Sequence, residues 1–190
     1  ACTTRADVPP PATDLRLQRE LLTRVASDQA VRDTFAAQLR ATGTLTPAVV
    51  ASMRAVDSVN LAWLKPQLRS AGFPTRAQVG KEAVQAAALL VQHADAEPTF
   101  QAEVLPLIEA AYRAGDLTGQ EVAMLTDRVA KAQGRPQRYG TQTTGIDGRI
   151  VFDPIEDSAH VDARRASMGL PPLAIYKQLL DSMYGRKPAP

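Results

Sequence analysis

The sequence predicts a mainly α-helical protein, a bundle of about six to seven helices with one small β-hairpin near residues 137–153. Apolar residues recur at three- and four-residue spacing through most of the chain, which is typical of amphipathic helices. Helix start and stop signals divide these stretches, and no alternation of strands and helices indicates a parallel sheet. With 190 residues, 45% of them hydrophobic and 22% charged, the chain matches one soluble globular domain. We place that domain at residues 13–185, between a tether at 1–12 and a disordered tail at 186–190.

The first two helical segments are separated by a glycine. Apolar residues between positions 15 and 39 predict either one long helix or two short helices that meet near Asp28, and Gly43 ends this segment. Thr46 and Pro47 predict a second helix, with threonine as the N-cap and proline in the first turn. We expect Pro66 to break or kink that helix, because proline lacks the amide hydrogen.

Two capping boxes mark the starts of later helices. Thr75 and Gln78 predict a helix that runs through "EAVQAAALLVQHAD", since each side chain can bond the other's free backbone N–H. The next helix, "EPTFQAEVLPLIEAAYRAG", is expected to bend at Pro106. Thr118 and Glu121 form the second box, which opens a helix that Gly134 ends.

The helical pattern stops after residue 134 and returns near residue 158. In "RYGTQTTGIDGRIVFDP" two short runs flank turn residues, which predicts a hairpin. Helices follow in "SAHVDARRASMG" and "PPLAIYKQLLDSMYG". We expect Asp162, Arg164 and Arg165 to form a solvated or ion-paired helix face.

The start of the chain is similar to a processed lipoprotein. Cys2 follows a small residue and precedes a polar stretch with Pro9, Pro10 and Pro11. In bacterial lipoproteins such a cysteine is lipidated after signal cleavage, and a proline-rich segment suits an extended tether. This interpretation predicts a periplasmic protein held to a bacterial membrane by lipid on Cys2. The alternative is an incidental cysteine near a disordered terminus.

Several strings resemble a known family. "GFPTRAQVG", "VQHADAEPTFQ", "DRVAKAQGRPQRYGTQ" and "VDARRASMGLPPLAIY" occur in this order over residues 72–176. They resemble an uncharacterised bacterial family, domain of unknown function 6624, with its Val-Gln-His-Ala-Asp helix end and Pro-Gln-x-Tyr-Gly-Thr-Gln loop. Phe73 stands where that family typically has tryptophan. The resemblance supports the helical fold and implies no activity.

His93 is the candidate catalytic residue. It continues an apolar helix stripe, and Gln92 and Asp95 lie beside it at the helix end. A carboxylate near an imidazole can fix its tautomer and support acid–base chemistry. A core histidine with one satisfied hydrogen bond is the alternative, and Asp95 is also suited to cap the following helix.

The polar loop "GRPQRYGTQTT" is the candidate ligand-binding segment. Arg138, Tyr139 and Gln142 could bind an anionic or amide-bearing ligand. If the hairpin packs across the end of the "VQHAD" helix, these groups and His93 line one pocket. The alternative is that they satisfy backbone groups and fix the hairpin to the bundle.

Composition and missing motifs narrow the function classes. Net charge is +2 with acids and bases interspersed, so nucleic acid is not an expected partner. No metal site, phosphate loop or nucleophile elbow is present, and we expect no cofactor.

Two classes of function remain. The first is a lipid-tethered periplasmic binding or inhibitor protein, of the immunity type, whose partner could be a secreted antibacterial toxin. The second is a hydrolase or transferase that uses His93. The sequence narrowly favours binding.

Overall fold

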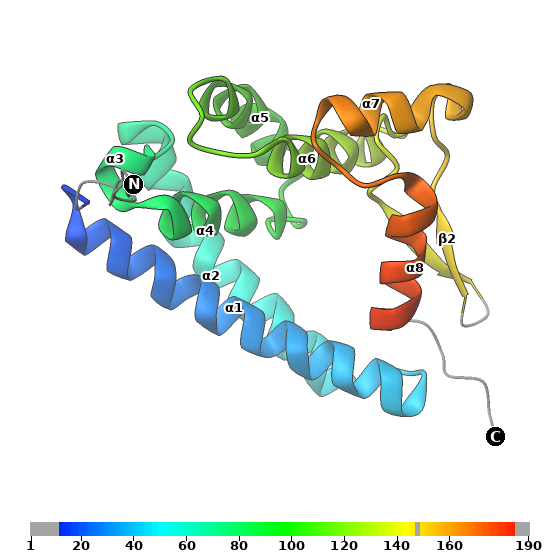
Figure 1. The fold of residues 1–190 in the computed structure, drawn as a ribbon. Helices are drawn as coiled ribbons and strands as arrows, with labels where there is room; N and C mark the ends of the chain where they lie inside the picture. Colours follow the sequence, from blue (N-terminus) through cyan, green and yellow to red (C-terminus); the bar gives the residue numbers. More distant parts are fainter. Residues whose placement is uncertain (1–11, 147–148, 185–190) are drawn as a thin grey trace, which may run out of the picture.

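The structure, a computed structural model, describes residues 12–146 and 149–184 and is mainly α-helical with a two-stranded sheet, as predicted (Figure 1). Cys2 lies outside the described residues, so its role stays a prediction. In chain order the elements are α1 (Leu15–Thr42), α2 (Pro47–Ala71), α3 (Arg76–Val79), α4 (Lys81–Gln92), α5 (Pro98–Arg113), α6 (Gly119–Ala132), β1 (Thr143–Ile146), β2 (Arg149–Phe152), a 3-10 turn (Ser158–His160), α7 (Val161–Ser167) and α8 (Leu173–Tyr184).

The two longest helices, α1 and α2, lie side by side (Figure 1). α1 is one uninterrupted helix that ends at Gly43 in the left-handed conformation, which confirms the first of the two alternatives. α2 begins with Thr46 as N-cap and does not break at Pro66. Leu64 and Leu68 on either side of that proline are both buried, and their burial offsets the hydrogen bond that proline removes.

The helix predicted after Thr75 is divided in two. Thr75 and Gln78 form the expected capping box, but α3 ends after one turn at Gly80. Gly80 has φ +82° and ψ 165°, a conformation that no helix contains and that glycine adopts readily. This division raises the number of α-helices in the described part of the chain to eight, against the six to seven expected. The second capping box, Thr118 with Glu121, opens α6 as predicted.

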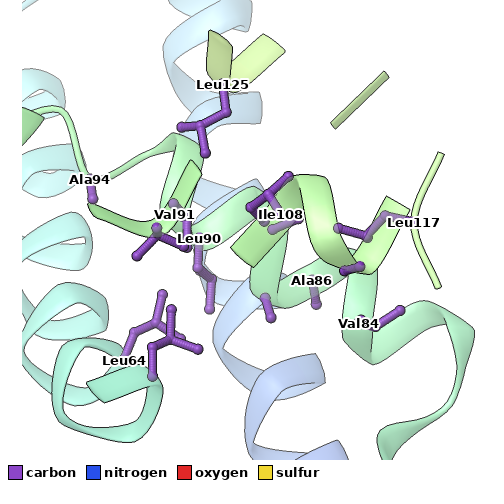
Figure 2. Packing of buried hydrophobic residues seen from close by; sticks show 14 of the residues in the cluster. Leu64, Val84, Ala86, Leu90, Val91, Ala94, Ile108, Leu117 and Leu125 are labelled. Carbon is purple, nitrogen blue, oxygen red and sulfur yellow. The ribbon is translucent and has the colours of Figure 1, made fainter. Parts of the chain in front are cut away.

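The core is centred on α4, which packs against α1, α2, α5 and α6. Its alanines are buried on several sides of the helix, because small side chains let neighbouring helices approach closely. Figure 2 shows leucine and isoleucine side chains from the surrounding elements packing against the side chains of this helix. The residues labelled there are Leu64, Val84, Ala86, Leu90, Val91, Ala94, Ile108, Leu117 and Leu125.

The C-terminal third forms a separate layer beside α6. β1 and β2 pair antiparallel, with Thr143 opposite Phe152 and Ile146 opposite Arg149, which confirms the predicted hairpin. α8 packs against β2, and near its end the carbonyl of Met183 accepts a hydrogen bond from Arg40 of α1 at 3.2 Å. Within the described residues no helix is both long and apolar enough to cross a membrane.

Candidate functional site

His93 caps the C-terminal end of α4 and contacts α1. Its ring Nδ1 lies 2.8 Å and 3.0 Å from the two carboxylate oxygens of Asp28. Asp28 is fully buried, whereas the His93 side chain keeps 16% of its surface exposed. The carboxylate that meets the imidazole therefore comes from the middle of α1, 65 residues earlier in the sequence.

The Asp28 carboxylate is surrounded by donors. Arg32 Nη1 lies 2.8 Å from Oδ1, and Gln29 Nε2 donates to Oδ2 at 2.9 Å. The second arm of the Arg32 guanidinium binds Asp57 of α2 at 2.8 Å. A buried carboxylate is stable only when it is paired and hydrogen-bonded, and these contacts meet that requirement. The same network joins α1, α2 and α4.

The contact with Asp28 determines which ring nitrogen of His93 carries the proton. An ionised carboxylate only accepts hydrogen bonds, so Nδ1 must donate. In the neutral imidazole Nε2 is then an acceptor with a free lone pair. Within the described part of the chain Nε2 has no hydrogen-bond partner. The arrangement can therefore take a proton at Nε2 while Asp28 stabilises the resulting imidazolium.

Gln92 and Asp95, the predicted neighbours of His93, have other roles. Gln92 is buried, and its carbonyl accepts a hydrogen bond from the Gln101 side chain at 3.0 Å. Both Asp95 oxygens bind Arg128 of α6, at 2.6 and 2.7 Å. The N-cap of α5 is Glu97, so the expectation that Asp95 caps this helix was wrong. The ion pair with Arg128 is the stronger use of that carboxylate, since both partners are charged and Nη1 contacts both carboxylate oxygens.

The loop at 134–142 is organised by Asp127 of α6. This fully buried carboxylate accepts hydrogen bonds from the backbone N–H groups of Arg138 (2.7 Å), Tyr139 (3.0 Å) and Thr141 (2.9 Å). It also accepts one from the Thr141 hydroxyl at 3.0 Å. One carboxylate thus satisfies three loop amides that would otherwise be unpaired.

Two more buried side chains hold the loop and the hairpin together. The Gln137 amide bonds the carbonyl and N–H of Gln142 and the carbonyl of Asp153, at 2.8–2.9 Å. Arg165 donates to the carbonyls of Tyr139 and Pro171, at 2.7 and 2.6 Å. Burial lowers the pKa of the Arg165 guanidinium, and the expectation that this residue lies on a solvated face was wrong.

A family model matches residues 15–189, the model of a family of unknown function (DUF6624). The chain belongs to this family. The match covers nearly all of the described structure and agrees with the resemblance carried by the "VQHAD" and "PQRYGTQ" strings. Searches of curated proteins and of solved structures found no match.

In this DUF6624 protein the predicted ligand-binding residues Arg138 and Gln142 have partners of their own. Arg138 is exposed and pairs with Glu156 at 3.0 Å. The neighbouring Tyr139 phenol and then the charge of Glu156 raise the pKa of Arg138, against the effect of burial. Gln142 is buried, and its amide donates to the Thr141 hydroxyl at 3.1 Å.

No hydrogen bond or ion pair joins His93 to the loop among the described residues. Both segments contact α6 instead, through consecutive residues: Arg128 holds Asp95, and Asp127 holds the loop. A shared pocket of His93, Arg138, Tyr139 and Gln142 therefore stays a prediction. Over the same residues no cluster of three or more His, Cys, Asp or Glu side chains could hold a metal ion.

Proposed function

We propose that the protein is an enzyme that uses His93 as a general acid or base, with Asp28 as the residue that positions it. The single observation that supports this proposal is the Nδ1 contact with a fully buried carboxylate, which leaves Nε2 free at the protein surface. A histidine needed only for packing has no use for a charged partner, because burying a carboxylate is unfavourable. We therefore place the enzyme role before the binding role that composition and motifs narrowly favour.

The chemistry would take place at Nε2. A substrate hydroxyl or a water molecule would give its proton to this atom as its oxygen forms a bond to the acyl or phosphoryl centre. The Asp28 charge would stabilise the imidazolium, which returns the proton to the leaving group as the bond between that group and the same centre breaks. Arg32 and Gln29 hold the carboxylate in place, so the imidazole keeps one orientation. The reaction class is hydrolysis or group transfer, as the sequence suggests for the enzyme alternative.

The tautomer can be measured directly, because the chain contains only two histidines. In protein labelled with ¹⁵N-histidine we expect His93 in its neutral form to carry the proton on Nδ1. His160 is the internal control for the effect of burial, since its Nδ1 also contacts an aspartate but both side chains are exposed to solvent. A His93 ring protonated on Nε2 would contradict the proposal.

Activity is tested with a panel of ester, amide and phosphate-ester substrates. We expect His93→Gln to abolish turnover and Asp28→Asn to lower kcat roughly 10⁴-fold, as when a catalytic histidine loses its orienting carboxylate. His160→Gln should leave turnover unchanged. Circular dichroism shows whether each variant is folded. Turnover that survives in a folded His93→Gln protein would refute the proposal.

A lipid-tethered binding or inhibitor role is the second candidate, and one surface feature favours it. Ile175, Leu179 and Met183 are spaced four apart on α8 and are 52%, 51% and 41% exposed. Exposed apolar side chains gathered on one face mark interaction sites in soluble proteins. A protein partner, of which a secreted toxin is one kind, would bury this face, and lipid on Cys2 would hold the pair at a periplasmic membrane.

This candidate is tested by pull-down from a periplasmic extract. We expect Leu179→Asp to lose a partner that the wild-type chain retains, because an aspartate in the contact would have to be buried. Leu107→Asp is the matched control, since Leu107 is also an exposed leucine but lies on α5. Equal loss in both variants would argue against a specific surface on α8.

A further inference from the structure

A groove with a volume of about 420 Å³ lies between α1 and α2. Val56 and Val59 of α2 form an apolar wall, and Val59 is 62% exposed. Arg24 of α1 and Asn60 of α2 supply polar groups to the same groove. Its size falls within the range of small-molecule sites, which are mostly apolar with a few placed polar groups.

Asn60 has a hydrogen-bonding group without a partner. Its side chain is 94% buried, and its Oδ1 accepts a hydrogen bond from Arg24 Nη1 at 3.3 Å. A guanidinium has donors only, so this contact fixes which end of the amide is oxygen. The Nδ2 group has no acceptor among the described residues and is also screened from solvent. A buried donor in this state is unfavourable, and such groups call for a specific explanation.

The charge of Arg24 is already balanced. Its Nε and Nη2 contact the Glu20 carboxylate at 2.9 and 2.7 Å, and its guanidinium lies 4.4 Å from the centre of the Trp63 ring. The polar end of the groove therefore offers amide hydrogens without a net positive charge. A neutral oxygen acceptor complements this end better than a carboxylate, which would compete with Glu20.

We propose that the groove between α1 and α2 binds a small neutral amphipathic molecule that carries a carbonyl group. The apolar part lies on Val56 and Val59, and the carbonyl oxygen accepts a hydrogen bond from Asn60 Nδ2. Because Nδ2 is covered in this structure, the oxygen reaches it only after a neighbouring side chain rotates. The site differs from the Asp28–His93 pair and does not depend on the catalytic role proposed for that pair.

The experiment uses hexanamide as the probe, and Asn60 makes it specific because it is the only asparagine in the chain. In protein labelled with ¹⁵N-asparagine, the side-chain NH₂ signals come from this residue alone. We expect saturable shifts of these signals on titration with hexanamide, and weaker or no shifts with hexylammonium, which lacks an acceptor. Side-chain signals of Asn60 that stay unmoved at saturating hexanamide would overturn the proposal.

Two variants separate the hydrogen bond from the apolar wall. Asn60→Asp keeps an acceptor for Arg24 but removes the donors, and we expect the Kd for hexanamide to rise about five- to tenfold. Val59→Ser shortens the apolar wall on an exposed position, so it should weaken binding without affecting folding. Thermal unfolding identifies a variant that fails to fold. Wild-type affinity in both folded variants would overturn the proposal.

Discussion

Removal of the Asp127 carboxylate should open the loop at 134–142 while the helical bundle stays folded. In Asp127→Ala the N–H groups of Arg138 and Tyr139 can reach water, because these residues are exposed or half-buried. The N–H and hydroxyl of Thr141 cannot, since this residue is only 8% exposed. Two buried donors without an acceptor cost about 1–3 kcal/mol each, and a shift of the loop recovers part of that cost. We therefore expect a local loss of about 3 kcal/mol.

Hydrogen–deuterium exchange measures this loss where it occurs. A change of about 3 kcal/mol corresponds to a roughly hundredfold rise in the population of the open loop, and amide exchange there should rise by the same factor. Peptides from α1, α2 and α4 should exchange as in the wild type. Thr141→Val is the matched control, because it removes one of the four donors to Asp127, together with the acceptor of the Gln142 amide, and should cost about 1–2 kcal/mol.

Two outcomes would refute this reasoning. Wild-type exchange in the loop of Asp127→Ala would mean that the carboxylate does not hold the loop. An equal rise in exchange over α1 and α4 would mean that the loop and the bundle unfold as one unit.

Three further outcomes are expected. Burial raises the pKa of Asp153, but hydrogen bonds from Lys131 and Thr144 outweigh this effect, so that its pKa is lowered. The hairpin should therefore lose stability as the pH falls below about 4. Asp153→Asn should remove this pH dependence, as urea titrations at several pH values would show. Gly140 has φ +69°, and an added Cβ would lie 2.7 Å from a leucine methyl of α8. Gly140→Ala should therefore lower the free energy of unfolding by about 1–3 kcal/mol, which a lower midpoint of thermal unfolding would show. Cys2→Ser in the native host should move the protein from the membrane fraction to the soluble fraction if the cysteine carries lipid, as fractionation and immunoblotting would show.

Features set by neighbours in the sequence could be predicted. The capping boxes at Thr75 and Thr118 each depend on a partner three residues away, and both are present. The hairpin follows from two short runs, the second of them apolar, with turn residues between them. The break at Gly80 was missed because one glycine within a helical pattern is usually tolerated, and only its backbone angles show that the chain turns there.

The partners of His93 could not be read from the sequence in the same way. Asp95 is two residues away and was the obvious carboxylate, whereas Asp28 is 65 residues away on another helix. The spacing of Asp28 and Arg32 indicates an i,i+4 ion pair on α1, as the structure shows. Such a pair on one helix does not indicate which face is buried or which helix packs against it. In the sequence, Asp28 instead lies where one of the two alternatives places the end of a short helix.

A cluster of polar residues in a sequence indicates function only where the side chains remain free. In the polar loop the amide of Gln137 and the hydroxyl of Thr141 are used to hold the backbone of the loop or the carboxylate beneath it. These contacts favour the structural alternative for much of the polar loop, which the sequence marks as the candidate ligand-binding segment. Among the described residues His93 and Asn60 differ from these, because Nε2 of His93 and Nδ2 of Asn60 have no hydrogen-bond partner. In both cases one end of the side chain is held by a charged partner and the other end is unused. That asymmetry is what a functional group requires, since an oriented donor or acceptor loses little entropy when a ligand binds.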